Sequence, residues 1–251
     1  MKIAVLIAGE YREFPIAHKF WNFLKWPNID CYFATWDKSI FVNKNSAIPD
    51  IVETVTMSSI TEFIHVIDAD IAESTPIPIN GTTAYKQINR WKSAIQLLIN
   101  SNKKYDRVIL IRPDIALDYD EGFLKKFMEE TITDDTHLYG ICGGNLYIPF
   151  PLDKVKKMSD LMLMGTQSSI EKLLQLPIVN EEYTDIHEYL ANNCVLLYSE
   201  FRNLPIPRQC IVRSNCRVIA DLDFPKCKLL AKEWWEEKHK HFYHMGENIY
   251  E

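Results

Sequence analysis

The 251-residue sequence lacks the features that define several large classes of protein. No window approaches about 18 uninterrupted apolar residues, so we expect no membrane-spanning helix. Lys and Arg total 28 against 34 for Asp and Glu, giving a formal net charge of -6. This balance argues against general nucleic-acid binding, which needs dense basic surface to neutralise phosphates. The first residues lack the longer apolar core and cleavage site of a signal peptide. These absences predict a soluble, cytoplasmic protein.

Several sequence motifs are also missing. None of the six cysteines forms a CxxC pair, and four of them lie in apolar segments. Buried free thiols in a reducing compartment are therefore favoured over disulfides, which remain the alternative. The chain has no GxGxxG fingerprint, P-loop, G-x-S-x-G elbow or kinase motif set. We therefore do not expect a dinucleotide cofactor.

What is present fits one sizeable α/β domain. The chain is 47% hydrophobic and 25% charged, which is ordinary for a globular domain. In the first half, apolar strand patterns alternate with helix patterns, so we predict a three-layer α/β/α sandwich with a mostly parallel, Rossmann-like sheet. We expect one domain over 1–251, with a nucleotide-binding half (1–120) and a half that completes the ligand site (121–251). Strands are predicted over 2–8, 30–36, 51–55, 63–67, 108–111, 137–142, 161–164, 194–198 and 218–222, and helices over 13–25, 83–100, 168–176 and 185–192.

The most informative segment is the apolar run 108–111, which stops abruptly at Arg112, Pro113 and Asp114. In open α/β sheets, ligands bind just outside the carboxyl ends of such strands. Hard divalent cations take carboxylate oxygens, so Asp114 is a candidate ligand of Mg²⁺ or Mn²⁺. Alternatively, Asp114 caps a helix that begins near Gly122, or forms a turn after the proline.

Two further segments are candidates for contacting a ligand. Ala8, Gly9 and Arg12 follow the first strand, where glycine lets the backbone approach a ligand and arginine can bind phosphate. The alternative is a tight turn with a surface arginine. Gln87 and Arg90 flank the apolar stripe of the helix over 83–100, where they either reach a nucleotide or sugar or form a solvated helix face.

Other acidic residues are candidates for proton transfer or metal binding. Asp160 precedes an apolar strand and Glu188 lies at a helix start; either can be a general base, and either can have a purely structural role. Asp118 and Asp120 are close enough in sequence to assist a metal at Asp114. The late triplet 221–223 has a DxD pattern but is interpreted as a turn.

A histidine cluster near the end of the chain is weaker. His239, His241 and His244 do not share one face of a helix or strand, so zinc is not expected. One of them remains a possible late ligand of a metal at Asp114.

Five segments, in order along the chain, resemble certain GT-A-fold glycosyltransferases of viral, phage and bacterial surface-glycan and lipopolysaccharide synthesis. The opening IAVLIAGEYREF is similar to their "ISGQPRTF" start, and ATWD to "HTWD". YDRVILIRPD resembles "YDYVIRTRPD", and MSDLMLMG resembles "NDQFFIGS". HEYL is similar to a "PExLL" helix start, with His187 where proline is usual.

The resemblance implies a GT-A-like fold and transfer of a sugar from a nucleotide-diphosphate donor to a glycan or small-molecule acceptor. It implies that Asp114 is the remaining metal-contacting carboxylate, for Mn²⁺ or Mg²⁺, and that Asp160 or Glu188 deprotonates the acceptor. The expected nucleotide-sugar-binding residues are Ala8, Gly9, Arg12, Trp36, Gln87, Arg90 and Arg112.

Two alternative functions stay open. A metal-dependent phosphohydrolase would use Asp114 with Asp118 or Asp120. A catalytically silent nucleotide- or sugar-binding protein on the same fold would explain why the first acid of the DxD motif is absent.

Overall fold

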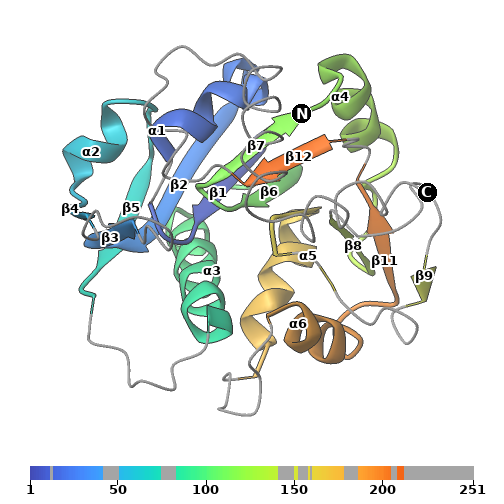
Figure 1. Ribbon diagram of the computed structural model, residues 1–251. Coiled ribbons are helices and arrows are strands. Elements are labelled where there is room, and N and C mark those ends of the chain that lie inside the picture. Colours follow the sequence, from blue (N-terminus) through green and yellow to red (C-terminus); the bar gives the residue numbers. More distant parts are fainter. Residues whose placement is uncertain are drawn as a thin grey trace, which may run out of the picture.

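The computed structural model describes residues 1–11, 14–41, 51–74, 83–140, 150–151, 158, 160–177, 186–204 and 208–211. The helices and strands in these ranges are arranged around one large sheet (Figure 1). The strands are β1 (Ile3–Ala8), β2 (Ile29–Trp36), β3 (Lys38–Phe41), β4 (Ile51–Thr54), β5 (Asp68–Ala72), β6 (Arg107–Ile111), β7 (Ile115–Asp118), β8 (His137–Gly140), β9 (Phe150–Pro151), β10 (Met162–Gly165), β11 (Glu200–Asn203) and β12 (Arg208–Ile211). The helices are α1 (Phe14–Ala17), α2 (Met57–Thr61), α3 (Thr83–Asn100), α4 (Glu121–Glu130), α5 (Gln167–Glu171) and α6 (Ile186–Cys194), with short 3₁₀ turns η1 (His18–Phe20), η2 (Asn22–Lys25) and η4 (Lys172–Gln175).

The large sheet has eight strands in the order β5-β2-β1-β6-β10-β8-β11-β9. The first four are parallel, and numbered among themselves they have the order 3-2-1-4 of a Rossmann-like sheet. Strand β10 then enters antiparallel between β6 and β8, while β11 is parallel to β8 and β9 antiparallel to β11. Four of the seven neighbouring pairs are therefore parallel. The predicted α/β class with a mostly parallel sheet is confirmed.

Helices cover both faces of this sheet, which makes three layers (Figure 1). Strand β1 shows why, because all six of its residues are buried and alternate between two hydrophobic clusters. Ile3, Val5 and Ile7 pack in the cluster that includes α1, α2 and α4 residues. Ala4 and Leu6 pack in the cluster that includes α3, α5 and α6 residues.

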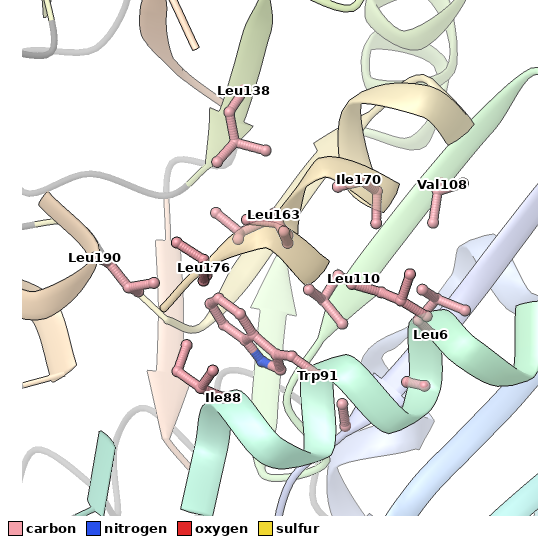
Figure 2. Close-up of a cluster of buried hydrophobic side chains, with 14 of the residues drawn as sticks. Leu6, Ile88, Trp91, Val108, Leu110, Leu138, Leu163, Ile170, Leu176 and Leu190 are labelled. Atoms are coloured by element: carbon pink, nitrogen blue, oxygen red, sulfur yellow. The ribbon is translucent and has the colours of Figure 1, made fainter. Parts of the chain in front are cut away.

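Helix α3 has the bounds that the apolar spacing predicts and covers the second face. Ile88 and Trp91 are 3% and 1% exposed. Figure 2 shows both side chains directed toward Leu110 of β6 and Leu163 of β10. Burial of each such side chain contributes roughly 1.5–3 kcal/mol relative to exposure, so this face fixes the helix on the sheet.

The long helix predicted over 13–25 is wrong. Residues 14–25 form α1 followed by η1 and η2. Trp21 interrupts any continuous helix with φ -105° and ψ 68°, and its indole Nε1 donates a 2.6 Å hydrogen bond to the Ile115 carbonyl. The apolar residues were correctly predicted to be buried, as Phe14 and Phe20 show. The helix does not continue through Trp21, whose indole is held by the hydrogen bond to Ile115.

Two predicted strands are also wrong. Residues 63–67 form the connection after α2, and the strand is β5, which pairs in parallel with β2 at the sheet edge. Residues 194–198 complete α6 and a turn, and the strand is β11. Cys194 and Tyr198 are buried without being in a strand, so apolar character alone misled the prediction. The predicted strand over 218–222 lies outside the described residues.

Two cysteines, Cys31 and Cys194, are buried free thiols within the described ranges. Burial raises the pKa of each thiol to about 12. The prediction of buried free thiols is confirmed at these two positions. No helix in the described part of the chain is both long and apolar enough to cross a bilayer.

Candidate functional site

Segments far apart in sequence meet at one edge of the sheet. The parallel strands β1, β2, β5 and β6 all end there. Strand β10 runs the opposite way and therefore starts at this edge, where the Leu161 carbonyl accepts a 3.0 Å hydrogen bond from the Arg112 amide. The residues after β6 and before β10 are thus neighbours.

A cluster of charged side chains forms at this junction. The Arg112 guanidinium donates from Nε to Asp114 Oδ1 at 3.0 Å and from Nη2 to Asp114 Oδ2 at 2.7 Å. Its Nη1 donates to Asp160 Oδ2 at 2.9 Å. The two carboxylate side chains are only 2% and 4% exposed. We refer to Arg112, Asp114 and Asp160 as the Arg112 clamp.

Local geometry explains the clamp. Pro113 and Asp114 form a turn between β6 and β7, as the alternative of a turn after the proline predicted, and Pro113 restricts the backbone between Arg112 and Asp114. A planar guanidinium matches a carboxylate in a two-point fork. Burial alone would lower the pKa of Arg112, but the charges of Asp114 and Asp160 outweigh it and raise this pKa. The arginine is therefore a permanent cation.

His187, at the start of α6, lies beside the clamp. Its Nδ1 bonds the Met158 carbonyl at 2.7 Å, and the Met158 amide donates to the His187 carbonyl at 3.0 Å. The same Nδ1 is 3.8 Å from Asp160 Oδ1. Within the described residues, this buried Oδ1 has no hydrogen-bond partner. Asp160 thus has one oxygen held by Arg112 and one with unused accepting capacity.

The loop after β1 is packed tightly. Gly9 has φ +143°, and a Cβ there would lie 3.1 Å from both Pro113 Cδ and Gln87 Oε1. Gln87 Nε2 donates to the Ala8 carbonyl at 2.9 Å. Glycine is therefore required by the left-handed backbone and by close contact between three segments. Gln87 joins α3 to the end of β1.

Arg90 is the second buried arginine near this edge, and it is only 4% exposed. Its Nη1 donates to the Thr35 carbonyl at 3.0 Å and to Asp70 Oδ2 at 2.9 Å. The guanidinium carbon lies 4.2 Å from the centre of the Trp36 ring. Arg90 therefore faces inward from α3 and does not form a solvated helix face.

Two polar groups at Arg90 have unused hydrogen-bonding capacity. In the described part of the chain, the buried Arg90 Nε and Trp36 Nε1 have no hydrogen-bond partner. They come from α3 and from the end of β2, and the Arg90 guanidinium lies against the Trp36 ring. Buried polar groups are nearly always paired, so these two donors call for a polar ligand or water. We refer to Arg90 and Trp36 as the Arg90 group.

The remaining predicted residues do not join these clusters. Arg12 lies outside the described residues, as do the triplet 221–223 and the three late histidines. Glu188 is exposed on α6, and the α6 side chain that approaches Asp160 is His187. Asp120 caps α4, with Oδ1 accepting from the Phe123 amide at 2.7 Å. Asp114 is therefore not the helix cap, and that alternative is wrong.

The residues that the structure describes do not fit a metal ion at Asp114. Both of its oxygens already accept hydrogen bonds from Arg112. In the same residue ranges, no group of three or more His, Cys, Asp or Glu side chains could hold a metal. Metal binding at Asp114 stays a prediction from the sequence.

Some residues of the site had little sequence signal. Thr35 belongs to the ATWD segment, but only its neighbour Trp36 was predicted to bind a ligand. Asp70 and Ser74 follow the misassigned strand over 63–67. The replacement of proline by His187 was a visible signal, and its structural consequence is the reciprocal bonding to Met158.

Comparisons with known proteins give remote likenesses of fold. The sequence matches no family model and no curated protein. A glycosyltransferase, GlyE of Streptococcus pneumoniae TIGR4, is 9% identical with a TM-score of 0.45, over 93% of this chain and 50% of that one. The present chain thus spans half the length of GlyE.

Two other solved structures are similarly distant. A cytidylyltransferase from Leptospira borgpetersenii is 15% identical over 82% of this chain and 76% of its own, with a TM-score of 0.40. The galactosyltransferase LgtC is 12% identical over 81% and 73%, with a TM-score of 0.39. The structural neighbours thus include glycosyltransferases and a nucleotidyltransferase, but at these TM-scores we base no functional argument on them.

Proposed function

We propose that this chain is a glycosyltransferase that moves a sugar from a nucleotide-diphosphate donor to a hydroxyl acceptor. The proposed acceptor is a surface glycan or polysaccharide. One observation carries the proposal. Four segments of the sequence resemblance contain Gly9, Trp36, Asp114 and Asp160, and these positions gather at one edge of a Rossmann-like sheet. Ligands bind at this edge in open α/β sheets.

The Arg90 group offers polar contacts for the donor. Its two unpaired donors can bond a nucleoside or sugar, and the Trp36 ring supplies a flat apolar surface beside them. Gly9 and Gln87 would border the donor between β1 and β6. The leaving diphosphate develops negative charge, which nearby guanidinium groups can stabilise.

Asp160 is the better placed of the two proposed bases. Its Oδ1, unpaired within the described ranges, would accept the proton of an acceptor hydroxyl after a local opening, because the side chain is only 4% exposed and Oδ2 is fixed by Arg112. Glu188 is exposed and would need to approach the acceptor from α6. Whether the sugar's configuration is inverted or retained is left to measurement of the product.

A second candidate function is a silent nucleotide- or sugar-binding protein. The observation that favours it is the Arg112 clamp, which occupies both oxygens of Asp114 and one of Asp160. The phosphohydrolase alternative has less support, because Asp120 is engaged as the cap of α4.

The first test is a thermal-shift panel of nucleoside diphosphates and nucleotide sugars, with and without Mn²⁺. A ligand that binds only the folded state raises the melting temperature, so at least one nucleotide should produce a shift of several degrees at saturating concentration. If no nucleotide changes the melting temperature, the transferase proposal is wrong.

The second test uses turnover of the nucleotide sugar that binds. Asp160→Asn should lower slow donor hydrolysis or transfer by about 10²–10⁴-fold while the thermal shift persists. Glu188→Gln tests the competing base in the same assay, and exposed Glu130→Gln serves as the control. Binding without turnover in the wild type, with every acceptor offered, would support the silent binder.

A further inference from the structure

The Arg112 clamp has a feature that the metal expectation does not explain. Two buried carboxylates at strand ends are the usual means of holding a divalent cation. Here the space between them contains a cation that belongs to the chain. The Arg112 guanidinium bonds both oxygens of Asp114 and one oxygen of Asp160, at 2.7 to 3.0 Å.

We propose that Arg112 is the built-in cation of this carboxylate pair, and that Asp114 and Asp160 hold the arginine and do not bind a divalent metal ion in the native protein. Mg²⁺ and Mn²⁺ need direct contact with carboxylate oxygens, at about 2.0–2.2 Å. A metal ion on either oxygen of Asp114 would have to share that oxygen with an N–H of the guanidinium or displace it. A metal ion and the guanidinium would also repel each other at this short range.

Burial makes this exchange unfavourable. The Arg112 side chain is 16% exposed, and the carboxylates are nearly inaccessible. A displaced guanidinium would lose three charge-assisted hydrogen bonds and would need another buried partner or a path to water. Pro113, packed against Gly9, holds the backbone between the arginine and its partner. The clamp is therefore closed to small cations.

The proposal predicts a gain of metal binding when the arginine is removed. Arg112→Ala leaves Asp114 and Asp160 facing one vacated position, and Mn²⁺ can then neutralise both. We expect Mn²⁺ to raise the melting temperature of Arg112→Ala by several degrees and to leave the wild type unchanged. The double variant Arg112→Ala/Asp114→Asn should lose this rescue, and exposed Lys126→Ala should behave as wild type.

Direct binding is measured by loss of the free Mn²⁺ signal in electron paramagnetic resonance, without any nucleotide. Stoichiometric Mn²⁺ binding by the wild type that disappears in Asp114→Asn would overturn the proposal. A folded Arg112→Ala protein that gains no Mn²⁺ binding would also overturn it. Wild-type binding that survives both Asp114→Asn and Asp160→Asn lies elsewhere in the chain and leaves the proposal standing.

If Arg112→Ala does not fold, the decision rests on the wild type and Asp114→Asn, whose folding is checked by circular dichroism. Because these measurements use Mn²⁺ alone, the result does not depend on the proposed transferase function. A nucleotide panel that fails would refute the transferase and leave the clamp intact. Mn²⁺ binding by the wild type that is lost in Asp114→Asn, together with a positive nucleotide panel, would refute the clamp proposal and leave the transferase proposal intact.

Discussion

Two buried arginines near the same edge of the sheet have opposite surroundings. Arg112 bonds two carboxylates that are 2% and 4% exposed, whereas Arg90 bonds one carboxylate, Asp70, that is 38% exposed. Arg90 also bonds a carbonyl and lies against the Trp36 ring. Burial lowers the pKa of Arg90 more than Asp70 raises it, while the two carboxylates raise the pKa of Arg112.

The sequence predicted that Arg90 and Arg112 both bind the nucleotide sugar, but their surroundings indicate two different roles. Arg112 has its charge compensated by neighbours and links the ends of β6 and β10. Arg90 keeps a buried Nε without a partner among the described residues, beside the Trp36 ring, whose Nε1 is also unpaired there. A polar ligand would therefore gain more hydrogen bonds from the Arg90 group, and Arg112 would define the shape of the site.

The largest expected effect is on Arg112. Arg112→Leu removes three charged hydrogen bonds and leaves two buried carboxylates without their cation, so the free energy of unfolding should fall by about 3–5 kcal/mol. Urea denaturation measures the change. The triple variant Arg112→Leu/Asp114→Asn/Asp160→Asn removes the uncompensated charge and should recover much of the loss. A single variant within about 0.5 kcal/mol of wild type would contradict the role of the clamp.

A smaller effect is expected at Arg90. Arg90→Leu removes two hydrogen bonds and the contact with Trp36, but Asp70 can be hydrated and one unpaired donor is removed as well. The free energy of unfolding should fall by about 1–2 kcal/mol. Asp70→Asn is the matched control and should cost less. A loss at Arg90 equal to that at Arg112 would remove the distinction between the two arginines.

The smallest effect is a difference in pH dependence between two lysine variants. In Arg90→Lys, burial should lower the lysine pKa below its ordinary value of about 10.4, so the unfolded state binds more protons and stability should rise as pH approaches that value. In Arg112→Lys, the two carboxylates should raise the pKa, so the stability they supply should be lost as pH rises above about 10.4. Denaturation of each variant relative to wild type, from pH 7 to 11, measures slopes that should have opposite signs.

The sequence predicted local features of the site better than their pairing. The apolar run 108–111 and the Arg112-Pro113-Asp114 sequence correctly located β6 and its charged end. The partner Asp160 was recognised as a strand-border acid, but its bond to Arg112 depends on β10 entering antiparallel beside β6. Local periodicity carries no information on strand direction in the sheet.

Arg90 illustrates a second limit. Its spacing on α3 put it beside the apolar stripe, where a solvated face is common. It is buried because the side chains of Trp36 (β2) and Asp70 (β5) contact it from neighbouring strands of the sheet. The strand that contains Asp70 was missed, because the apolar residues 63–67 had been assigned as the strand instead. Burial of a charged group depends on partners that only the tertiary structure supplies.

The two ion pairs of the clamp differ in sequence separation, and this predicts the order in which they form during folding. Arg112 and Asp114 are two residues apart, so their pair closes a very short loop, whereas Arg112 and Asp160 are 48 residues apart. Closing the longer loop costs more chain entropy and requires β10 to dock first. We therefore expect the Arg112–Asp114 ion pair to form before the Arg112–Asp160 ion pair. Docking of β10 brings Asp160 to Arg112, so we expect the Arg112–Asp160 ion pair to form late in folding, together with the completed site.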